Sequence, residues 1–425
     1  MAKYILWFTI AVVAFAADPA EGWKPWAPRP EIAPRTYLDP LVSRTTGASL
    51  AVSSNSNSAA HGGWERSVPV EPGKWYRLSA YYKDENLSYE RGQVVAILDW
   101  QTSAGKRSGF PEFAAQTKGE GAWHRLIAEA PAPSDARSVK VQLFLSHAPQ
   151  GVVWWDDISL DQIPAPPPRL VTVVSLNLRP EGSQTSAQSV EQFVQLAEKL
   201  APRKTDIIVL PEGVTVVGTP LGQAEAGEAV PGPTTARLGE LARKTNSYVA
   251  AGLYERVGAA VYNTAVLIDR QGRLAGKYRK VYLPREEYEA GLTPGRDYPV
   301  FETDFGKVGM MICWDVQYAD PARALALRGA QLIVLPIWGG SPALAKARAL
   351  ENQVFIAASG YDFPTEILDP LGNIVAEAPR RGSAAIATID LNQRYVQDWL
   401  GNMRPRFQQE IRLDVPVLPR GETNQ

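Results

Sequence analysis

The sequence is poor in the side chains that thiol chemistry most often needs. Cys313 is the only cysteine, so no internal disulfide can form. The three histidines, His61, His124 and His147, all lie before position 150. A cysteine nucleophile paired with a histidine base would therefore need a histidine from another part of the fold. If Cys313 is a nucleophile rather than a small buried side chain, we expect a carboxylate as its base and a lysine as its charge partner.

The chain also lacks an excess of charge of either sign. Its formal net charge is -1, and basic and acidic residues are interspersed without a basic stripe or an acidic tail. A nucleic-acid partner is therefore not expected. We also expect no cofactor and no metal.

Long hydrophobic runs are absent except at the start. One early lysine, Lys3, precedes an apolar stretch that ends in Ala14-Phe15-Ala16, the pattern of a signal peptide at residues 1–16 that is cut after Ala16. The stretch is shorter than the roughly 20 residues of a spanning helix. No cysteine follows it that could carry a lipid. We therefore expect a soluble exported protein, periplasmic or extracellular, without a stable membrane anchor.

The length and a proline-rich stretch indicate two domains. A chain of 425 residues is long for one ordinary domain. Ile163–Arg169, with four prolines, has few backbone donors and is predicted to be a semi-rigid linker. The expected domains are residues 23–162 and 170–425. Eight of the twelve tryptophans lie in the first.

The first domain has the period of β-strands. In Ser138–Ser146 the residues Val139, Val141, Leu143 and Leu145 share one face, and the stretches 75–82 and 93–100 are strand-like too. Turn residues separate these stretches. Short strands with frequent turns predict an antiparallel β-sandwich.

Several pieces between about Leu50 and Leu160 resemble jelly-roll carbohydrate-binding modules. They are the turn Pro72-Gly-Lys-Trp-Tyr76, Ala122-Trp-His124, and the closing stretch Val152–Leu160. The resemblance implies a jelly roll and carbohydrate as a possible partner. Tryptophans can stack on sugar rings, but we expect most of the eight to fill the core or to face the other domain.

In the second domain, stretches with the period of β-strands alternate with stretches that have the period of helices. Strands are expected at 170–176, 206–210, 248–252, 262–269, up to Cys313, and at 331–336, and helices at 190–200, 234–244, 321–328 and 343–351. This alternation predicts an α/β domain whose sheets are covered by helices.

Three chemically active residues stand where strands of this domain end. They are Glu212 after a buried strand, Lys280, and Cys313. A free cysteine has a pKa of about 8.5 and needs a base or a cation to react as a thiolate. Glu212 can accept the proton, Lys280 can stabilise negative charge, and the Trp314 backbone N–H can complete an oxyanion hole.

These motifs resemble the nitrilase superfamily of carbon–nitrogen hydrolases, from Val171 to about Leu400. The matching stretches are Leu210-Pro-Glu212, Tyr278-Arg-Lys280-Val-Tyr-Leu-Pro284 and Gly309-Met-Met-Ile-Cys313-Trp-Asp315, with support from Val261–Ala265, Arg328–Pro336 and Arg348–Asn352. The resemblance implies a four-layer αββα sandwich, a dimer, and a Glu212–Lys280–Cys313 triad. It also implies an auxiliary glutamate, for which Glu287 is preferred over Glu286 and Glu289.

Two departures and four aromatic residues bear on the substrate. Many members of the superfamily have histidine where this chain has Tyr282, and the stretch after Trp314 lacks the paired arginines of some carbamoyl-amino-acid hydrolases. Tyr282, Trp314, Trp338 and Tyr361 are candidate pocket residues by position.

The preferred hypothesis is an amide hydrolase that forms a thioester on Cys313. The alternatives are a nitrilase that acts on a nitrile, and a sugar-binding protein on a hydrolase scaffold without turnover. A glycosidase is disfavoured because no paired-carboxylate motif is apparent.

Overall fold

The computed structural model describes residues 20–45 and 47–416, which form two compact units. One contains the chain up to Pro166 together with the segment from Arg394, and the other is Pro167–Gln393. The predicted signal peptide, 1–16, lies outside the described residues. Within the described ranges, no helix has the length and apolar character needed to cross a membrane.

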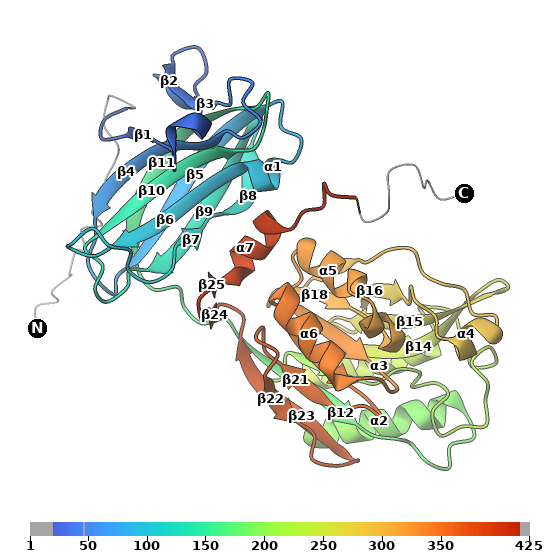
Figure 1. Cartoon of the computed structure of the whole chain (residues 1–425). Coiled ribbons are helices and arrows are strands. Elements are labelled where there is room, and N and C mark those ends of the chain that lie inside the picture. Colours follow the sequence, from blue (N-terminus) through green and yellow to red (C-terminus); the bar gives the residue numbers. More distant parts are fainter. Residues whose placement is uncertain (1–19, 46, 417–425) are drawn as a thin grey trace, which may run out of the picture. The chain divides into compact units, whose positions relative to one another are not determined.

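The first unit, called the all-β unit below, consists mainly of two antiparallel sheets (Figure 1). The first sheet has the order β1 (Lys24–Trp26), β4 (His61–Pro69), β10 (Ser138–Ser146), β6 (Val94–Gln101) and β7 (Glu112–Phe113). The second has the order β2 (Arg35–Asp39), β3 (Ser49–Ser53), β11 (Val152–Ile163), β5 (Trp75–Glu85), β9 (Trp123–Pro131) and β8 (Ala115–Glu120). Short helices η1 (Pro30–Ile32) and α1 (Glu90–Gln93) connect strands.

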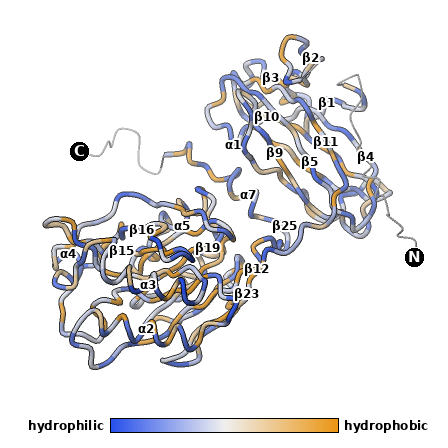
Figure 2. Tube along the Cα trace, turned by 180° about the vertical axis from the view of Figure 1, so that it is seen from behind, coloured by the Kyte–Doolittle hydropathy of each residue, from blue (hydrophilic) through white to orange (hydrophobic). Residues whose placement is uncertain are grey.

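The inner faces of these sheets share one hydrophobic core. The predicted alternation of β10 holds, because Val139, Val141, Leu143 and Leu145 are all buried. Figure 2 shows hydrophobic residues along strands such as β5 and β9. The eight tryptophans of this unit are either buried (23, 64, 100, 154 and 155) or half-buried (26, 75 and 123). They are therefore chiefly core residues, as expected, and none is an open stacking surface.

The segment after Gln393 completes the all-β unit. It contains β24 (Val396–Gln397), β25 (Gly401–Asn402) and α7 (Met403–Glu410). Arg394 forms an ion pair with Glu112, and the Gln409 side chain donates to the carbonyl of Ala114. The hydrolase domain expected from the sequence is 170–425. In the structure, the compact unit that contains the start of this range ends at Gln393. Sequence periodicity did not reveal this return, because the segment is short and polar.

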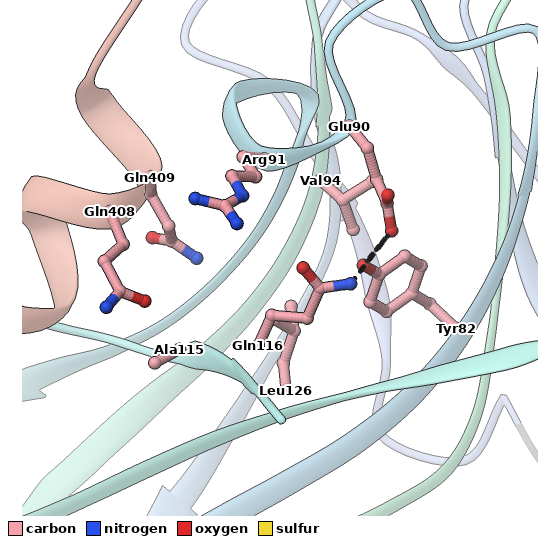
Figure 3. Close-up of a pocket in the computed structure, with 9 residues that line it drawn as sticks. All are labelled: Tyr82, Glu90, Arg91, Val94, Ala115, Gln116, Leu126, Gln408 and Gln409. Carbon is pink, nitrogen blue, oxygen red and sulfur yellow. Dashed lines mark hydrogen bonds between the residues drawn. The ribbon is translucent and has the colours of Figure 1, made fainter. Parts of the chain in front are cut away.

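A small cavity of about 70 Å³ lies in the all-β unit beside α7 (Figure 3). Its lining is mostly polar and includes Tyr82, Glu90, Arg91, Gln116 and Gln409. Pockets for small molecules are usually about 300–1,000 Å³. This cavity is therefore too small for an ordinary ligand pocket.

The second unit contains two mixed six-stranded sheets that contact each other. The first has the order β16 (Leu274–Arg279), β15 (Ala260–Ile268), β14 (Tyr248–Val257), β13 (Ile207–Val209), β12 (Leu170–Asn177) and β23 (Ser383–Asp390). The second has the order β17 (Val300–Glu302), β18 (Lys307–Met310), β19 (Leu332–Pro336), β20 (Phe355–Ser359), β21 (Glu366–Leu368) and β22 (Ile374–Glu377). In each sheet three consecutive strands are parallel, namely β12–β14 and β18–β20.

Helices cover both sheets (Figure 1). Helices α2 (Ser186–Leu200) and α3 (Pro233–Thr245) pack on the first sheet, and α5 (Asp320–Leu327) and α6 (Pro342–Asn352) pack on the second. Helix α2 starts before the predicted Val190 because Thr185 caps it by accepting a hydrogen bond from the Gln188 N–H. Its buried stripe is Val190, Phe193, Val194 and Ala197, which matches the helical period.

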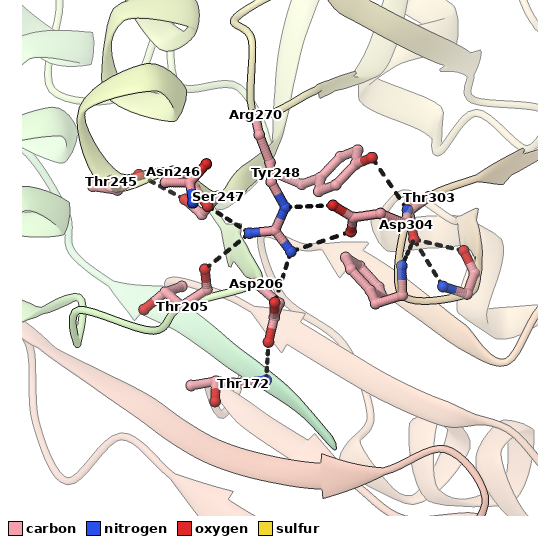
Figure 4. Close-up of polar contacts among 12 residues, drawn as sticks. Thr172, Thr205, Asp206, Thr245, Asn246, Ser247, Tyr248, Arg270, Thr303 and Asp304 are labelled. Carbon is pink, nitrogen blue, oxygen red and sulfur yellow. Dashed lines mark hydrogen bonds and ion pairs between the residues drawn. The ribbon is translucent and has the colours of Figure 1, made fainter. Parts of the chain in front are cut away.

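Arg270, in the turn between β15 and β16, joins loops at one end of this unit (Figure 4). Its guanidinium donates to Asp206, which precedes β13, and to Asp304, which lies between β17 and β18, at 2.7 Å each. It also donates to the carbonyl of Asn246 before β14. This planar donor group therefore joins loops that belong to both sheets.

Candidate active site

Glu212 stands just past the carboxyl end of β13, a fully buried strand between two parallel neighbours. The chain after it is bonded to β14, because the Val214 N–H donates to the Gly252 carbonyl of that strand at 2.8 Å. A Cβ at position 252 would lie 2.7 Å from the Cα of Glu212, so this close approach requires glycine. The backbone of Glu212 is thus held rigidly, and its side chain is only 3% exposed.

Lys280 lies between two buried glutamates. It follows β16 directly, and its Nζ lies 2.9 Å from an oxygen of Glu212 and 2.9 Å from an oxygen of Glu287 in α4 (Arg285–Glu289). Asn263 of β15 donates to the same two oxygens, at 2.7 Å and 2.5 Å. Burial alone would lower the pKa of Lys280, but Glu212, Cys313 and Glu287 raise it above its usual value. The lysine therefore remains an ammonium although it is buried.

The two carboxylates compete for this one cation. Burial raises the pKa of Glu287 to about 7, Lys280 opposes this rise, and the charge of Glu212 adds to it. Each glutamate also keeps a second carboxyl oxygen that is buried and has no hydrogen-bond partner among the described residues. At Glu212 that oxygen, Oε2, is a free acceptor for a proton.

Cys313 follows β18 and begins the short helix η2 (Cys313–Gln317) with a φ of 43°. This left-handed conformation is uncommon for a side chain other than glycine and typical of functional turns. Asp315 holds the turn, because its buried carboxylate accepts from the Ile312 N–H at 2.9 Å and from the Tyr278 hydroxyl at 2.7 Å. It also accepts from the Tyr282 N–H at 3.0 Å, which ties the cysteine turn to the lysine loop.

Burial favours the protonated form of the Cys313 thiol. Burial raises the pKa of Cys313 to about 12, Glu212 adds to this rise, and Lys280 and the backbone N–H groups of Trp338 and Gly339 lower it. The Sγ atom lies 3.7 Å from the Gly339 carbonyl oxygen. Attack by this sulfur therefore requires that a base remove the proton as substrate arrives.

The sequence profile of the carbon-nitrogen hydrolase family matches residues 170–399, which is more than half of the chain. The chain belongs to the carbon-nitrogen hydrolase family. The nitrilase-superfamily resemblance seen in the sequence is thereby confirmed, as is the expectation of a hydrolase of carbon–nitrogen bonds. Residues 167–393 are called the hydrolase unit below.

Proteins similar to this chain include amidases and a probable nitrilase. The chain is 30% identical to omega-amidase NIT2 of Xenopus tropicalis over 239 residues, which are 49% of this chain and 85% of the relative. It is 34% identical to a probable nitrilase of Schizosaccharomyces pombe, covering 48% of this chain and 82% of the relative. A double mutant of the amidase from Nesterenkonia sp. AN1, solved with acrylamide, is 20% identical and covers 53% of this chain and 92% of its own, with a TM-score of 0.46.

The structure of this hydrolase brings Glu212, Lys280, Glu287 and Cys313 together. Among the three candidates for an auxiliary glutamate, it buries Glu287, whereas Glu286 and Glu289 are exposed and Glu289 pairs with Arg285. The sequence alone did not decide between the three glutamates, because the length of the loop that carries them varies. In the structure, the short helix α4 turns the side chain of Glu287 inward.

The candidate pocket aromatics fall into two groups. The ring of Trp338 packs edge-on against Tyr361 with centroids 4.8 Å apart, and the Tyr361 hydroxyl donates to the Glu212 carbonyl at 2.8 Å. Tyr282 instead stacks on Tyr318 at 3.8 Å, and its hydroxyl donates to Asp320. Trp314, next to Cys313, has a side chain that is 37% exposed.

Two buried polar residues of the site were not singled out from the sequence. Asn263 lies within the stretch Val261–Ala265 that supported the family resemblance, so its motif was visible but its role was not. Asp315 ends the cysteine motif, and nothing in the sequence indicates its role. In both cases the role depends on hydrogen bonds between distant segments, which periodicity does not indicate.

Potential metal ligands gather in the other unit. Within the two described ranges, Asp84, Glu90 and His124 each place one ligand atom within 4.8 Å of the others and could hold an ion. They belong to the all-β unit, whereas the catalytic candidates all lie in Pro167–Gln393.

Proposed function

We propose that this carbon-nitrogen hydrolase cleaves the amide bond of a small molecule through a thioester on Cys313. One observation carries the proposal. The Oε1 atom of Glu212 is engaged by Lys280 and Asn263, whereas its Oε2 atom is buried and has no partner among the described residues. The charge of Glu212 also acts on Cys313, because it adds to the rise in the pKa of that thiol. A general base that is held on one side and free on the other suits proton transfer from the cysteine.

In the proposed reaction Glu212 takes the thiol proton while Sγ of Cys313 bonds to the amide carbon. Negative charge develops on the former carbonyl oxygen, and Lys280 and the Trp314 backbone N–H stabilise it. Glu212 returns the proton to the nitrogen, the carbon–nitrogen bond breaks, and ammonia or an amine leaves. Water, deprotonated by Glu212, then attacks the thioester and releases the acid and the thiol.

Glu287 serves as a positioning residue in this proposal. It shares the ammonium of Lys280 with Glu212 and has no need to contact the substrate. Trp338 and Tyr361 supply a wall of the substrate pocket, and Tyr282 its rim. An amide is preferred over a nitrile because the omega-amidase relatives are named for amide hydrolysis, although a relative named as a probable nitrilase also matches the chain.

The decisive experiment is a search by mass spectrometry for an acyl adduct on Cys313. The protein is incubated with panels of small amides, acyl-amino acids and nitriles, stopped in acid, and digested. An adduct with an amide, together with its absence in Cys313→Ala, is expected. Turnover by Cys313→Ala above about a thousandth of the wild-type rate would contradict covalent catalysis.

Several further assignments belong to this proposal, and each rests on fewer observations. We assign the all-β unit to the jelly rolls and the hydrolase unit to the four-layer αββα class, with the sheet orders and covering helices as support. Export rests on the sequence of residues 1–16, and a homodimer on the family resemblance. Carbohydrate binding rests on the resemblance of the all-β unit alone, since its tryptophans are buried or half-buried.

A further inference from the structure

Strand pairing in the all-β unit brings Asp84 of β5 next to His124 of β9. Tyr82 lies directly opposite His124, and residues two apart in a strand share a face, so Asp84 and His124 stand on the same face of the sheet. Asp84 is also opposite Val153 of β11, and both Tyr82 and Val153 belong to the hydrophobic core of this unit. The aspartate and the histidine therefore lie on the inner face, near the end of β5.

Glu90 reaches the same place from the short helix α1, which follows β5 and leads into β6 of the other sheet. Its carboxylate accepts a hydrogen bond from the Tyr82 hydroxyl (Figure 3). The Nδ1 atom of His124 lies 3.6 Å from a carboxylate oxygen of Glu90, and the Nε2 atom lies 3.9 Å from one of Asp84. The three side chains thus join two strands of one sheet to the connection toward the other sheet.

The two carboxylates have little positive charge to balance them. In the part of the chain that the structure describes, neither Asp84 nor Glu90 forms an ion pair with a lysine or an arginine, and His124 is the basic partner of both. Their side chains are only 20% and 33% exposed. Two like charges that are partly withdrawn from water repel each other, so a cation between them is favoured.

The cavity of about 70 Å³ adjoins this cluster and offers polar groups to a hydrated ion. Glu90 lines it together with Gln116, whose amide nitrogen lies 3.2 Å from Glu90 and 3.3 Å from His124. Gln409 of α7 lines it too, and its Oε1 atom is buried without a hydrogen-bond partner among the described residues, the whole residue being 7% exposed. One water needs only about 10–15 Å³, so water bound to an ion fits and can donate to Gln409.

We propose that Asp84, Glu90 and His124 bind one divalent metal ion that accepts nitrogen as well as oxygen ligands, such as Zn²⁺, with water from the cavity completing its coordination. The proposal is independent of the reaction at Cys313. An imidazole nitrogen favours zinc and similar ions over Ca²⁺ and Mg²⁺, which prefer oxygen ligands alone. The ion would tie β5, β9 and α1 together and so stabilise the all-β unit.

The geometry needs only a small adjustment to hold such an ion. One ligand atom from each of the three residues lies within 4.8 Å of the other two. Zinc binds nitrogen and oxygen at about 2.0–2.2 Å, so two of its ligand atoms are at most about 4.4 Å apart. Side-chain rotation can close this difference, because none of the three side chains is fully buried.

A cluster without an ion makes a different prediction. A protonated His124 would pair with both carboxylates by itself, and added metal would then have no effect on stability. The test therefore uses the full chain carrying Cys313→Ala, so that the thiol takes up no metal, after chelation with EDTA and removal of the chelator. Calorimetric titration with Zn²⁺ should show one site, and differential scanning calorimetry should show that Zn²⁺ raises the midpoint of one unfolding transition.

Three variants locate the site. Asp84→Asn and Glu90→Gln keep the shape of each side chain, and these two and His124→Ala should each weaken Zn²⁺ binding about tenfold or more. His147→Ala is the matched control and should bind Zn²⁺ as before, because His147 is an exposed histidine of the same unit that stacks on His61.

Three results would overturn the proposal. The first is the absence of saturable Zn²⁺ binding or of any rise in the midpoint. The second is an affinity that all three site variants leave within about tenfold of the unsubstituted value, or that His147→Ala lowers as much as His124→Ala. The third is tighter binding of Ca²⁺ than of Zn²⁺, since an imidazole ligand would then have no part in the site.

Discussion

The ammonium of Lys280 lies 2.9 Å from the carboxylate of Glu287, which is seven residues further along the chain and only 4% exposed. The same ammonium also lies 2.9 Å from the carboxylate of Glu212. Breaking a buried ion pair usually destabilises a protein strongly, because the remaining charge stays buried. Here three charges share one site, so the effect of each substitution depends on which charges remain.

Glu287→Gln should therefore lower kcat about tenfold to a hundredfold while the protein stays folded. The substitution leaves one carboxylate for one ammonium, so no buried charge is left without a partner, but Lys280 loses a charged partner that orients it. Steady-state kinetics on the amide found by adduct screening would measure this. Glu286→Gln, an exposed neighbour, is the control and should behave like the wild type. A wild-type kcat for Glu287→Gln would remove Glu287 from the site.

Stability should fall with rising pH in the window set by Glu287. Its pKa is raised from 4.5 to about 7, chiefly by burial and against the opposing effect of Lys280. Between these values the folded state holds more protons than the unfolded state, so the free energy of unfolding decreases as pH rises. Asp315 and Glu366, whose pKa values burial raises to about 6, act in the same direction.

Glu287→Gln removes only the contribution of Glu287 to this slope. Urea unfolding at several pH values between about 4.5 and 7 should give a flatter profile for the variant than for the wild type. Parallel profiles would mean that Glu287 is ionised throughout this range, and that the carboxylates do not compete for Lys280.

Substitutions of Lys280 and of Glu212 should have similar effects on kcat but different effects on the free energy of unfolding. Each should lower kcat by roughly a hundredfold or more, and the double mutant should lose far less than the product of the two effects. Lys280→Ala leaves two buried carboxylates without a cation and should cost about 3–5 kcal/mol of unfolding free energy. Glu212→Gln keeps the Lys280–Glu287 pair and should cost less. Additive kinetic effects would contradict a triad that acts as a unit.

Asn263 offers a test of a residue that only the structure identified. Asn263→Ala should lower kcat by about tenfold or more, because the donor that bridges Glu212 and Glu287 is lost and the two buried oxygens keep only Lys280 as a partner. Asn392→Ala is the matched control, since the Asn392 side chain donates only to the exposed Pro167 carbonyl in the same unit. An equal loss of activity in both variants would point to general destabilisation instead.

Sequence patterns predicted the elements of the fold well where one face of a strand or helix is buried. Strand β10 has the predicted bounds, and α6 differs from its predicted range by a single residue at each end. The catalytic candidates could be found because each stands at a strand end within a recognisable motif. The roles of Asn263 and Asp315 could not, because they arise from contacts between segments that are distant in sequence. The same limit explains why the segment from Arg394 was expected in the wrong unit.

That segment yields the final prediction. A chain that ends at Gln393 should keep its hydrolase activity, since Glu212, Lys280, Glu287 and Cys313 all lie in the unit Pro167–Gln393. The all-β unit should be destabilised, because it loses the Arg394–Glu112 ion pair, the bond from Gln409 to Ala114, and the contact of Arg406 with the Phe113 ring at 4.9 Å. Differential scanning calorimetry of the full chain and the truncated chain should show a lower midpoint for one transition and an unchanged midpoint for the other. The variant Arg394→Ala should lower the midpoint of the same transition by a smaller amount, because leaving the largely buried Glu112 unpaired costs part of what the whole segment contributes. If truncation abolished activity while both transitions kept their midpoints, the segment would have a catalytic rather than a structural role.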